Sequence, residues 1–434
     1  MIRIIPKSDR VERLEFMARL ATRSVGVDSA LLGVVSGIIE DVRTRGDVAL
    51  LEYTSRFDQV DLDVSDLRVS SEVLQQSASR VDPGVLLALR ASIRNVRAFH
   101  ERQREESWTE TTRDQVWLGQ KITPIESVGL YVPGGTAAYP SSVVMNVVPA
   151  QVAGVTRIVV TTPPETVRNN PAVAAALVEL GVNEVFAVGG AQAIAALAFG
   201  TETIPRVDKI TGPGNKYVAA AKKLVFGVVG IDSIAGPSEV VIVGDESARA
   251  DFIAADLLAQ AEHGEDASAV LITTSETVAD QVVNEIERQL SSLPRSSVAR
   301  SSLNSYGAIV LVESVSEASD IVNELAPEHL QLMTTDNDTV AEAVKHAGAI
   351  FFGPYSPEAV GDYFAGPNHV LPTGRTARFS SALGVYDFVK RTSIIGYSKA
   401  AMEDAADQIA ALANAEGLNG HARSALIRLI REVK

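Results

Sequence analysis

The sequence predicts an α/β protein made of two tandem doubly wound, Rossmann-like units on parallel sheets, with N-terminal helices and a C-terminal helical tail. The first observation is length, because 434 residues exceed one ordinary core and indicate two or more domains. The second is a hydrophobic content of 46%, which is typical of a globular protein with a substantial core. The third is an alternation of short apolar runs with alanine-rich segments from about residue 126, which is typical of a parallel sheet covered on both faces.

The first 125 residues are expected to form a helical region that packs on the core. Residues 8–56 and 83–106 are predicted to be helical. In the stretch "VLLALRASIRNVRAF", apolar side chains recur at three- and four-residue spacing while the arginines fall on another face. This pattern indicates a surface helix with solvated arginines.

Residues 126–236 are predicted to form the first Rossmann-like unit, because strand-like runs and helix-like segments alternate through it. "SVGLYV" leads through "PGG" to a helix near 141–153, "RIVVTT" to one near 171–181, "EVFAV" to one near 191–199, and "VDKITGPG" to one that starts near Asn215.

Residues 237–378 repeat the pattern and form the second unit, and residues 379–434 form the tail. "EVVIVG" precedes a helix over 246–263, "AVLITT" one over 276–291, "AIVLVE" one over 315–325 and "LQLMTT" one over 338–346, and "AIFFG" closes the series. The tail is predicted to be helical over 400–434, with a glycine-bearing break in "AEGLNGHARSA".

Composition excludes several classes of function. The net charge of −15 and the absence of a basic stripe argue against nucleic acid as a partner. The chain has no cysteine, so disulfides, thiolate–metal sites and a covalent thiohemiacetal are excluded. The N-terminus does not resemble a signal peptide, and no run approaches the ~20 apolar residues of a membrane span. A cytoplasmic protein without membrane contact is expected.

Three glycine-rich turns follow predicted strands and precede predicted helices: "YVPGGTAAYP", "VGGAQAIAAL" and "ITGPGNKYVAAAKK". Such turns expose backbone N–H groups at a helix N-terminus, where phosphate binds well. None is the full G-x-G-x-x-G fingerprint, and each taken singly is an ordinary tight turn. Together in one unit they favour a nucleotide or dinucleotide site.

The six histidines fall into two groups. His100 and His346 lie in predicted helices and are expected to be structural or surface residues. The other four lie in polar segments with glycine or proline, each close to an acid or an amide. These are His263, His329, His369 and His421. Either each is a hydrogen-bonded loop histidine, or several of them converge on one site.

Gln260 and His263 lie three residues apart in "LLAQAEHGED", where a helix would place them on one face, one turn apart. The stretch is either the solvated end of an ordinary helix or half of a metal site. In the second case, Gln260, His263, Asp362 and His421 could supply oxygen and nitrogen ligands to zinc in a chain without thiolates.

Glu328 and His329, in "LAPEHLQL", would then remain for proton transfer. Adjacent residues point in different directions, so the two side chains could serve two different protons. A histidine suits a general base, and a carboxylate suits the activation of water. A zinc hydrolase could use the same residues, but it leaves the three glycine-rich turns unexplained.

Eight motifs, in order along nearly the whole chain, make the sequence similar to the histidinol dehydrogenases. They are "VGLYVPGGTAAYPSSVVMN", "GGAQAIAALAFGT", "ITGPGNKYVAAAKK", "IAGPSEV", "AQAEHG", "APEHLQL", "GDYFAGPNHVLPT" and "EGLNGHARSA". The resemblance implies a homodimer with one zinc ion per subunit. It also implies oxidation of L-histidinol to L-histidine through L-histidinal, with two NAD⁺ consumed, as the last step of histidine biosynthesis.

The resemblance also assigns roles to residues, and every assigned position matches. It implies NAD contacts at Tyr131, Gln192 and Asn215 in the first unit. It implies a proton-transfer pair, Glu328 and His329, in the second. The zinc ligands that it implies are Gln260, His263, Asp362 and His421. The substrate contacts that it implies are these four ligands together with Ser238, His329 and Glu416. Because the C-terminal segment of the family reaches into the partner's site, Glu416 and His421 are expected to act from the other chain.

The lack of cysteine bears on the mechanism that the resemblance implies. Oxidising an alcohol to an acid removes four electrons, so hydride must leave twice, and the aldehyde must be hydrated in between. We expect His329 to deprotonate the alcohol and later the diol, Glu328 to activate the water, and zinc to orient the substrate. Two alternatives stay open: a relative that oxidises another amino or hydroxy alcohol, and a non-catalytic nucleotide-binding module.

Overall fold

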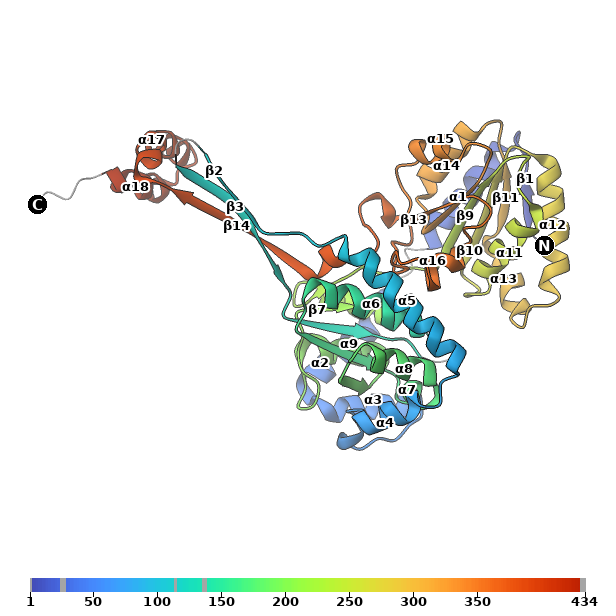
Figure 1. The fold of residues 1–434 in the computed structure, drawn as a ribbon, viewed down its shortest axis with the longest axis horizontal. Helices are drawn as coiled ribbons and strands as arrows, with labels where there is room; N and C mark the ends of the chain where they lie inside the picture. Colours follow the sequence, from blue (N-terminus) through green and yellow to red (C-terminus); the bar gives the residue numbers. More distant parts are fainter. Residues whose placement is uncertain (1, 24–28, 113–114, 135–138, 430–434) are drawn as a thin grey trace, which may run out of the picture. The chain divides into compact units, whose positions relative to one another are not determined.

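The computed structural model, drawn in Figure 1, describes residues 2–23, 29–112, 115–134 and 139–429. It divides into two compact units. The first comprises residues 1–103 and 126–387, and the second residues 104–125 and 388–434, within the described parts of the chain. Residues 135–138 of the turn "YVPGGTAAYP" and the last five residues of the predicted tail lie outside the described residues.

The first unit contains a five-stranded parallel sheet in the order β6-β5-β4-β7-β8. Its strands are β4 (Ser127–Tyr131), β5 (Arg157–Thr162), β6 (Glu184–Ala187), β7 (Lys209–Thr211) and β8 (Gly230–Ile231). From β4 at the centre, β5 and β6 follow on one side of the sheet, and β7 and β8 follow on the other side. This reversal is the doubly wound order, so the first of the two predicted doubly wound sheets is confirmed.

Helices cover this sheet where the sequence predicts them, with others besides. The predicted ones are α6 (Pro140–Ala153), α8 (Pro171–Glu179), α9 (Gly190–Phe199) and α10 (Lys216–Val225). The chain adds α7 (Pro164–Asn169) and, from the N-terminal region, α2 (Ser29–Arg45), α3 (Asp47–Asp58), α4 (Ser71–Ala78) and α5 (Pro83–Glu101). The predicted single helix over 8–56 is divided, and one break falls at Gly46, whose φ is +55°.

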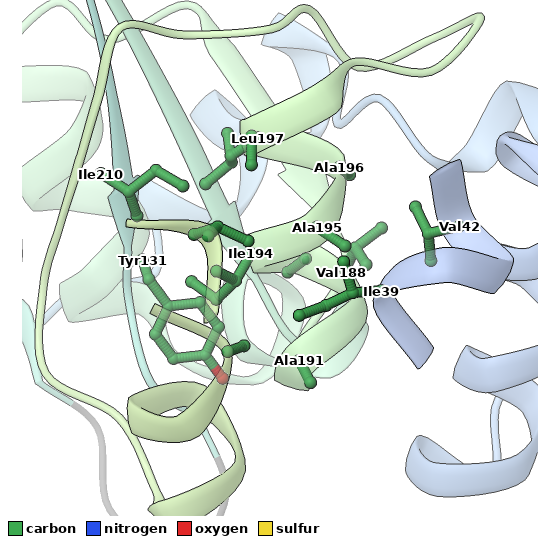
Figure 2. Close-up of a cluster of buried hydrophobic side chains, with 14 of the residues drawn as sticks. Ile39, Val42, Tyr131, Val188, Ala191, Ile194, Ala195, Ala196, Leu197 and Ile210 are labelled. Carbon is green, nitrogen blue, oxygen red and sulfur yellow. The ribbon is translucent and has the colours of Figure 1, made fainter. Parts of the chain in front are cut away.

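A tightly packed apolar core lies between α2, α9 and the sheet. Figure 2 shows Ile39 and Val42 of α2 facing the alanine-rich helix α9, with Tyr131 at the end of β4 on the other side of it. Small side chains such as Ala191 and Ala195 are buried at this contact. They let the helix approach closely, which explains why the segment is rich in alanine.

The first unit also contains a six-stranded parallel sheet in the order β1-β11-β10-β9-β12-β13. Its strands are β1 (Arg3–Ile5), β9 (Glu239–Gly244), β10 (Ser268–Thr273), β11 (Ala308–Leu311), β12 (His329–Met333) and β13 (Ala349–Phe352). Strands β9 to β13 repeat the doubly wound order, which confirms the second of the two predicted doubly wound sheets. The N-terminal strand β1 at its edge is not predicted from the sequence.

Two apolar clusters cover the two faces of this sheet. The helices of this part are α1 (Arg10–Arg23), α11 (Ala250–Ala261), α12 (Glu276–Leu290), α13 (Ser296–Tyr306), α14 (Val315–Leu325), α15 (Asn337–Ala343) and α16 (Glu358–Tyr363). The side chains of β9 and β10 are buried along their whole length, as expected for central strands of a covered parallel sheet.

The second unit combines a three-stranded antiparallel sheet with helices. Strands β2 (Trp108–Thr111), β3 (Val116–Pro124) and β14 (Val389–Tyr397) pair in the order β14-β3-β2. The helices are α17 (Lys399–Ala415) and α18 (Asn419–Leu426), separated by the predicted break at the glycine-bearing segment. The sheet ties residues 104–125 to the C-terminal segment, which the sequence analysis does not predict. None of the helices described in the structure is long and apolar enough to cross a membrane.

Candidate active site

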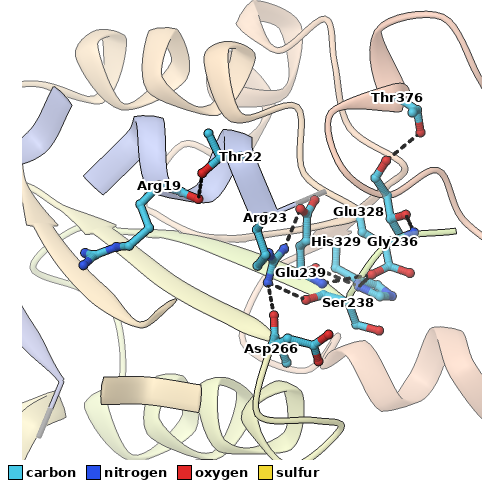
Figure 3. A network of polar contacts seen from close by, with 12 residues as sticks. Arg19, Thr22, Arg23, Gly236, Ser238, Glu239, Asp266, Glu328, His329 and Thr376 are labelled. Carbon is cyan, nitrogen blue, oxygen red and sulfur yellow. Dashed lines mark hydrogen bonds and ion pairs between the residues drawn. The ribbon is translucent and has the colours of Figure 1, made fainter. Parts of the chain in front are cut away.

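Glu328 and His329 lie at the amino end of β12, beside the amino end of β9. The two strands are parallel neighbours, and His329 pairs in register with Val240. The backbone of Glu239, the first residue of β9, contacts both side chains. Its N–H donates to Glu328 Oε2 at 2.9 Å, and its carbonyl lies 3.0 Å from His329 Nδ1. Figure 3 shows this arrangement.

The contact with the Glu239 carbonyl decides which nitrogen of His329 carries the proton. A carbonyl oxygen only accepts, so Nδ1 must donate, and Nε2 is left with a free lone pair. Nε2 is buried and has no hydrogen-bond partner among the described residues. Burial lowers the pKa of His329 to about 3, so the ring is neutral at pH 7.

Arg23 stabilises the start of β9. Its Nη2 lies 2.7 Å from Glu239 Oε1, and the guanidinium is almost fully buried. Its Nη1 also donates to the backbone carbonyls of Ser238 and Asp266, as Figure 3 shows. The ion pair therefore holds in place the residue whose backbone orients Glu328 and His329.

A second group of polar side chains comes from the end of α11 and from α16, and we call it the α11–α16 cluster. Its members are Gln260, His263, Glu358 and Asp362. One ligand atom each from His263, Glu358 and Asp362 lies within 4.8 Å of the others. The side-chain amide of Gln260 lies 3.1 Å from His263 Nδ1. Asp362 also faces the free nitrogen of His329, with its Oδ1 3.9 Å from Nε2.

Buried acids around this cluster make it suited to a cation. Burial raises the pKa of Asp362 to about 7. Burial also raises the pKa values of Glu358 and Glu328 well above their ordinary value, and the charge of Asp362 adds to both shifts. No arginine or lysine in the described part of the chain forms an ion pair with Glu358 or Asp362. A bound divalent cation would offset the cost of ionising these groups.

The donor set of this cluster fits zinc. Imidazole nitrogen, carboxylate oxygen and amide oxygen are all zinc donors, and the set contains no thiolate. Two orphaned nitrogens, Nε2 of His329 and Nε2 of His369, are buried without partners among the described residues. These atoms mark a polar space beside the cluster that a ligand could satisfy.

The three residues that the resemblance assigns to NAD lie near the carboxyl ends of the strands in the five-stranded sheet. Tyr131 ends β4, Gln192 lies in the first turn of α9, and Asn215 caps the N-terminus of α10. All three line one cavity of ≈ 1310 Å³. The Tyr131 hydroxyl accepts a hydrogen bond from the Gly190 N–H at 3.1 Å. Ligands of doubly wound sheets usually bind at this edge.

Gly212, in the motif "ITGPG", illustrates why this edge needs glycine. Its φ is +114°, a conformation that other residues rarely adopt. A Cβ at this position would lie 2.2 Å from the carbonyl oxygen of Tyr131. The close approach brings the turn after β7 against the end of β4, and so against the cavity.

The remaining predicted residues belong to other segments of the chain. Ser238 directly precedes β9 and is half-buried. Glu416 caps the C-terminus of α17, and His421 lies in α18 of the second unit; both side chains are exposed.

The histidines without an assigned role differ in their surroundings. His100 is fully buried, with Nδ1 2.7 Å from Gln103 Oε1. The backbone of His346 donates to Asn323 Oδ1 at 3.3 Å. Burial lowers the pKa of His369 to about 4, and its Nε2 has no hydrogen-bond partner among the described residues.

Known proteins resemble this chain over almost its whole length. The family profile described as histidinol dehydrogenase matches residues 21–429. The histidinol dehydrogenase of Geobacillus kaustophilus is 58% identical over 396 residues, which cover 91% of this chain and 93% of that protein. The chain belongs to the histidinol dehydrogenase family. The histidinol dehydrogenase of Bacillus subtilis is 54% identical over 391 residues, covering 90% of this chain and 91% of that protein.

A crystal structure in the histidinol dehydrogenase family has the same fold. The histidinol dehydrogenase of Elizabethkingia anophelis superposes with a TM-score of 0.91 at 36% sequence identity, and the match covers 99% of this chain and 98% of that one. The chain is therefore an oxidoreductase of this family, and the two doubly wound sheets and the second unit are features that it shares with a solved member.

Two residues at the centre of this candidate site, Glu239 and Glu358, are not predicted from the sequence. Glu239 acts through its backbone, and a backbone contact leaves no trace in residue type. Glu358 lies one helical turn before Asp362, and both are acids, so the spacing in "SPEAVGDY" is a signal that could have indicated it.

Asp256, on α11, provides a test of the buried acids by pH. Burial raises its pKa from 3.8 to about 6, although Oδ2 accepts from Gln331 Nε2 at 2.7 Å. Because the folded-state pKa is the higher one, the stability contribution is present at low pH and is lost as pH rises through about 6.

Asp256→Asn keeps the acceptor but does not ionise. Relative to this variant, the parent protein is expected to lose on the order of 1 kcal/mol of unfolding free energy between about pH 5 and about pH 8. Urea unfolding at both pH values measures the difference, and identical pH dependence of the two proteins would contradict the assignment.

Proposed function

We propose that this chain oxidises L-histidinol to L-histidine through L-histidinal, using two NAD⁺ and one zinc ion per subunit. Family membership supports the substrate and the overall reaction. The observation that carries the mechanism is the free, buried Nε2 of His329 beside Glu328 and the α11–α16 cluster. A base without a partner at a polar, buried position is what the abstraction of an alcohol proton requires.

Residues 126–236 would hold NAD, in the cavity lined by Tyr131, Gln192 and Asn215. NAD, when bound, would supply the acceptor for each of the two hydrides. Gln192 supports this assignment, because its Oε1 is buried without a partner among the described residues. The N-terminus of α9 also lines this cavity, through Gly190, Ala191 and Gln192, and phosphate groups bind well at a helix N-terminus.

Residues 237–378 would hold zinc and the reacting end of the substrate. Zinc ligands would be Gln260, His263 and Asp362 from this segment, together with His421 of the partner subunit. Zinc, when bound, would supply a fixed charge that orients the amine and imidazole nitrogens of histidinol. Ser238 and Glu416 of the partner subunit would contact the same polar substrate, with His329 positioned at its hydroxyl.

In the first oxidation His329 Nε2 would take the hydroxyl proton while the carbon loses a hydride, leaving the aldehyde. The hydrogen bond from Nδ1 to the Glu239 carbonyl holds the ring so that Nε2 faces the reacting atoms. That hydrogen bond also strengthens when the ring becomes cationic, which stabilises the protonated base. Burial keeps the ring neutral beforehand.

In the second oxidation Glu328 would take a proton from water as the water oxygen bonds to the aldehyde carbon. Protonated His329 would return its proton to the carbonyl oxygen, which gives the diol and a neutral His329. One oxygen of Glu328 is held by the Glu239 N–H, and the other is left to act. Its pKa is raised by burial, which makes the carboxylate a stronger base than an exposed one. His329 would then deprotonate the diol as the second hydride leaves, and L-histidine results.

The second compact unit, which contains β2, β3, β14, α17 and α18, supports the proposal of a homodimer with shared sites. Apolar side chains of its sheet and helices are exposed, including Ile395 at 72% and Leu412 at 71%. The others are Trp108, Trp117, Leu118, Tyr397, Ile409, Leu418, Leu426 and Ile427. An apolar surface of this kind is typical of an interface. In a dimer that forms through this apolar surface, residues 379–434 would lie at the partner's site.

Shared sites predict complementation between two inactive subunits. A purified heterodimer of His329→Asn with His421→Asn is expected to regain about half the activity of the parent dimer, because one of its two sites is intact. A heterodimer of His329→Asn with Glu328→Gln serves as the control and is expected to stay inactive. If the first heterodimer is also inactive, His421 acts within its own subunit.

The proposed reaction is tested by stoichiometry. With L-histidinol, NAD⁺ and Zn²⁺, the protein is expected to form two NADH for each L-histidine. A zinc hydrolase would form no NADH. A relative with another alcohol as substrate would turn over that alcohol and leave histidinol unchanged. One NADH per product, or none, would contradict the proposal.

A further inference from the structure

Glu358 is a buried acid at the centre of the cluster, and neither proton transfer nor the proposed ligand set uses it. Its side chain is only 3% exposed, in the first turn of α16. One helical turn later, Asp362 lies on the same face of the helix. The carboxyl group of Glu358 points toward α11, where it meets the side-chain amide of Gln260.

The surroundings of Gln260 determine which way its amide points. On one side the neighbours only accept: Glu358 Oε2 at 3.1 Å, Glu358 Oε1 at 3.3 Å and the Glu239 carbonyl at 3.2 Å. The amide nitrogen must face these atoms. The amide oxygen then faces His263 Nδ1 at 3.1 Å, on the side of the cluster where a metal ion would bind.

This orientation matters because the two ends of an amide differ in chemistry. The oxygen has lone pairs and can bind a cation, whereas the NH₂ group cannot. The oxygen and Nδ1 of His263 lie 3.1 Å apart, close to the separation of roughly 3.3 Å between two donor atoms that bind one tetrahedral zinc ion. Gln260 is fully buried, so water cannot replace a lost partner easily.

We propose that Glu358 is a positioning residue, which accepts from the amide of Gln260 and thereby turns its oxygen toward the metal. The inference rests on the zinc site of the proposed function. Glu358 acts as a hydrogen-bond acceptor here, not as a metal ligand. A glutamine at this position would keep an acceptor oxygen, and an aliphatic side chain would remove it.

The test measures the affinity for Zn²⁺ alone, by competition with a chelator of known affinity. Glu358→Gln is expected to stay within about threefold of the parent protein, and Glu358→Leu to bind zinc about 10–100-fold more weakly. Asp245→Asn, at a buried acid that follows the carboxyl end of β9 and accepts from the Thr335 N–H, is the matched control and is expected to leave the affinity unchanged. If Glu358→Leu does not fold, Glu358→Ala removes the same acceptor.

Each other pattern overturns the inference. Equal, large losses in the Gln and Leu variants would show that Glu358 is itself a ligand. No loss in either variant would show that it has no role at the metal. If the parent protein itself binds no zinc, the zinc site of the proposed function fails instead, so the two failures are distinguishable.

A double-mutant cycle with Gln260→Ala distinguishes positioning through Gln260 from a general structural role of Glu358. Once the amide is gone, Glu358 has nothing to position. Glu358→Leu is therefore expected to change zinc affinity by less than about threefold in the Gln260→Ala background, against the larger loss in the parent background. Additive losses would contradict positioning through Gln260.

Discussion

Replacing His329 with asparagine is expected to lower kcat by a factor on the order of 10³, because the variant lacks the base that takes the alcohol proton. The asparagine amide can still donate to the Glu239 carbonyl, which now accepts from His329 Nδ1 at 3.0 Å. What is lost is the free nitrogen Nε2, which faces Asp362. Steady-state formation of NADH from histidinol measures the change.

The control for this variant is His346→Asn, a histidine whose backbone bonds to Asn323 outside the cluster. It is expected to retain full activity. Zinc content of the His329 variant should stay near one ion per subunit, because His329 is not among the proposed ligands. Wild-type kcat in the His329 variant would exclude it as the base.

Replacing His263 with asparagine is expected to reduce bound zinc from about one ion per subunit to a small fraction of this value. His263 is the imidazole donor of the cluster, and its ligand atom lies within 4.8 Å of those of Glu358 and Asp362. Losing one of four ligands commonly weakens zinc binding by several orders of magnitude, because the remaining donors cannot complete the tetrahedral set. Metal analysis after gel filtration in metal-free buffer measures the loss.

Activity provides the second readout for the same variant. Histidinol oxidation should fall together with zinc content and should recover partly when excess Zn²⁺ is added, since the other donors remain. His346→Asn again serves as the control and should keep its zinc. Full zinc occupancy in the His263 variant would remove this residue from the ligand set.

The two parallel sheets could be predicted because their strands are buried runs of apolar residues between helices. "EVVIVG" and "AVLITT" became β9 and β10, with every side chain buried. The unit around β2, β3 and β14 could not be predicted in this way. Most side chains of β2 and β14 are exposed, so their sequences carry no apolar pattern strong enough to mark a strand.

The sequence indicated part of the site for a physical reason. Gln260 and His263 are close in the chain, and the resemblance to a family assigned Asp362 to the same group; the structure brings the three together. The contribution of Glu239 could not be predicted, because its contacts with Glu328 and His329 are made by its backbone N–H and carbonyl. Every residue except proline has both groups.

The edge of the sheet at which the cluster lies also required the structure. A doubly wound sheet usually binds ligands at the carboxyl ends of its strands, and the Tyr131 cavity follows that rule. Glu328 and His329 instead lie at the amino end of β12, and Gln260 meets them because α11 runs back across the sheet after β9. The direction of a strand, and the path of the helix that follows it, are properties of the fold rather than of local sequence.

We propose that Glu328 and His329 serve two separate protons, and rapid-mixing kinetics of Glu328→Gln distinguish their roles. His329 is untouched in this variant, so the first oxidation should proceed. We expect a burst of about one NADH per active site. Turnover after the burst should be slower than in the parent by a factor on the order of 10² or more, because the aldehyde is no longer hydrated efficiently. Absence of the first NADH, with folding and zinc content intact, would contradict it.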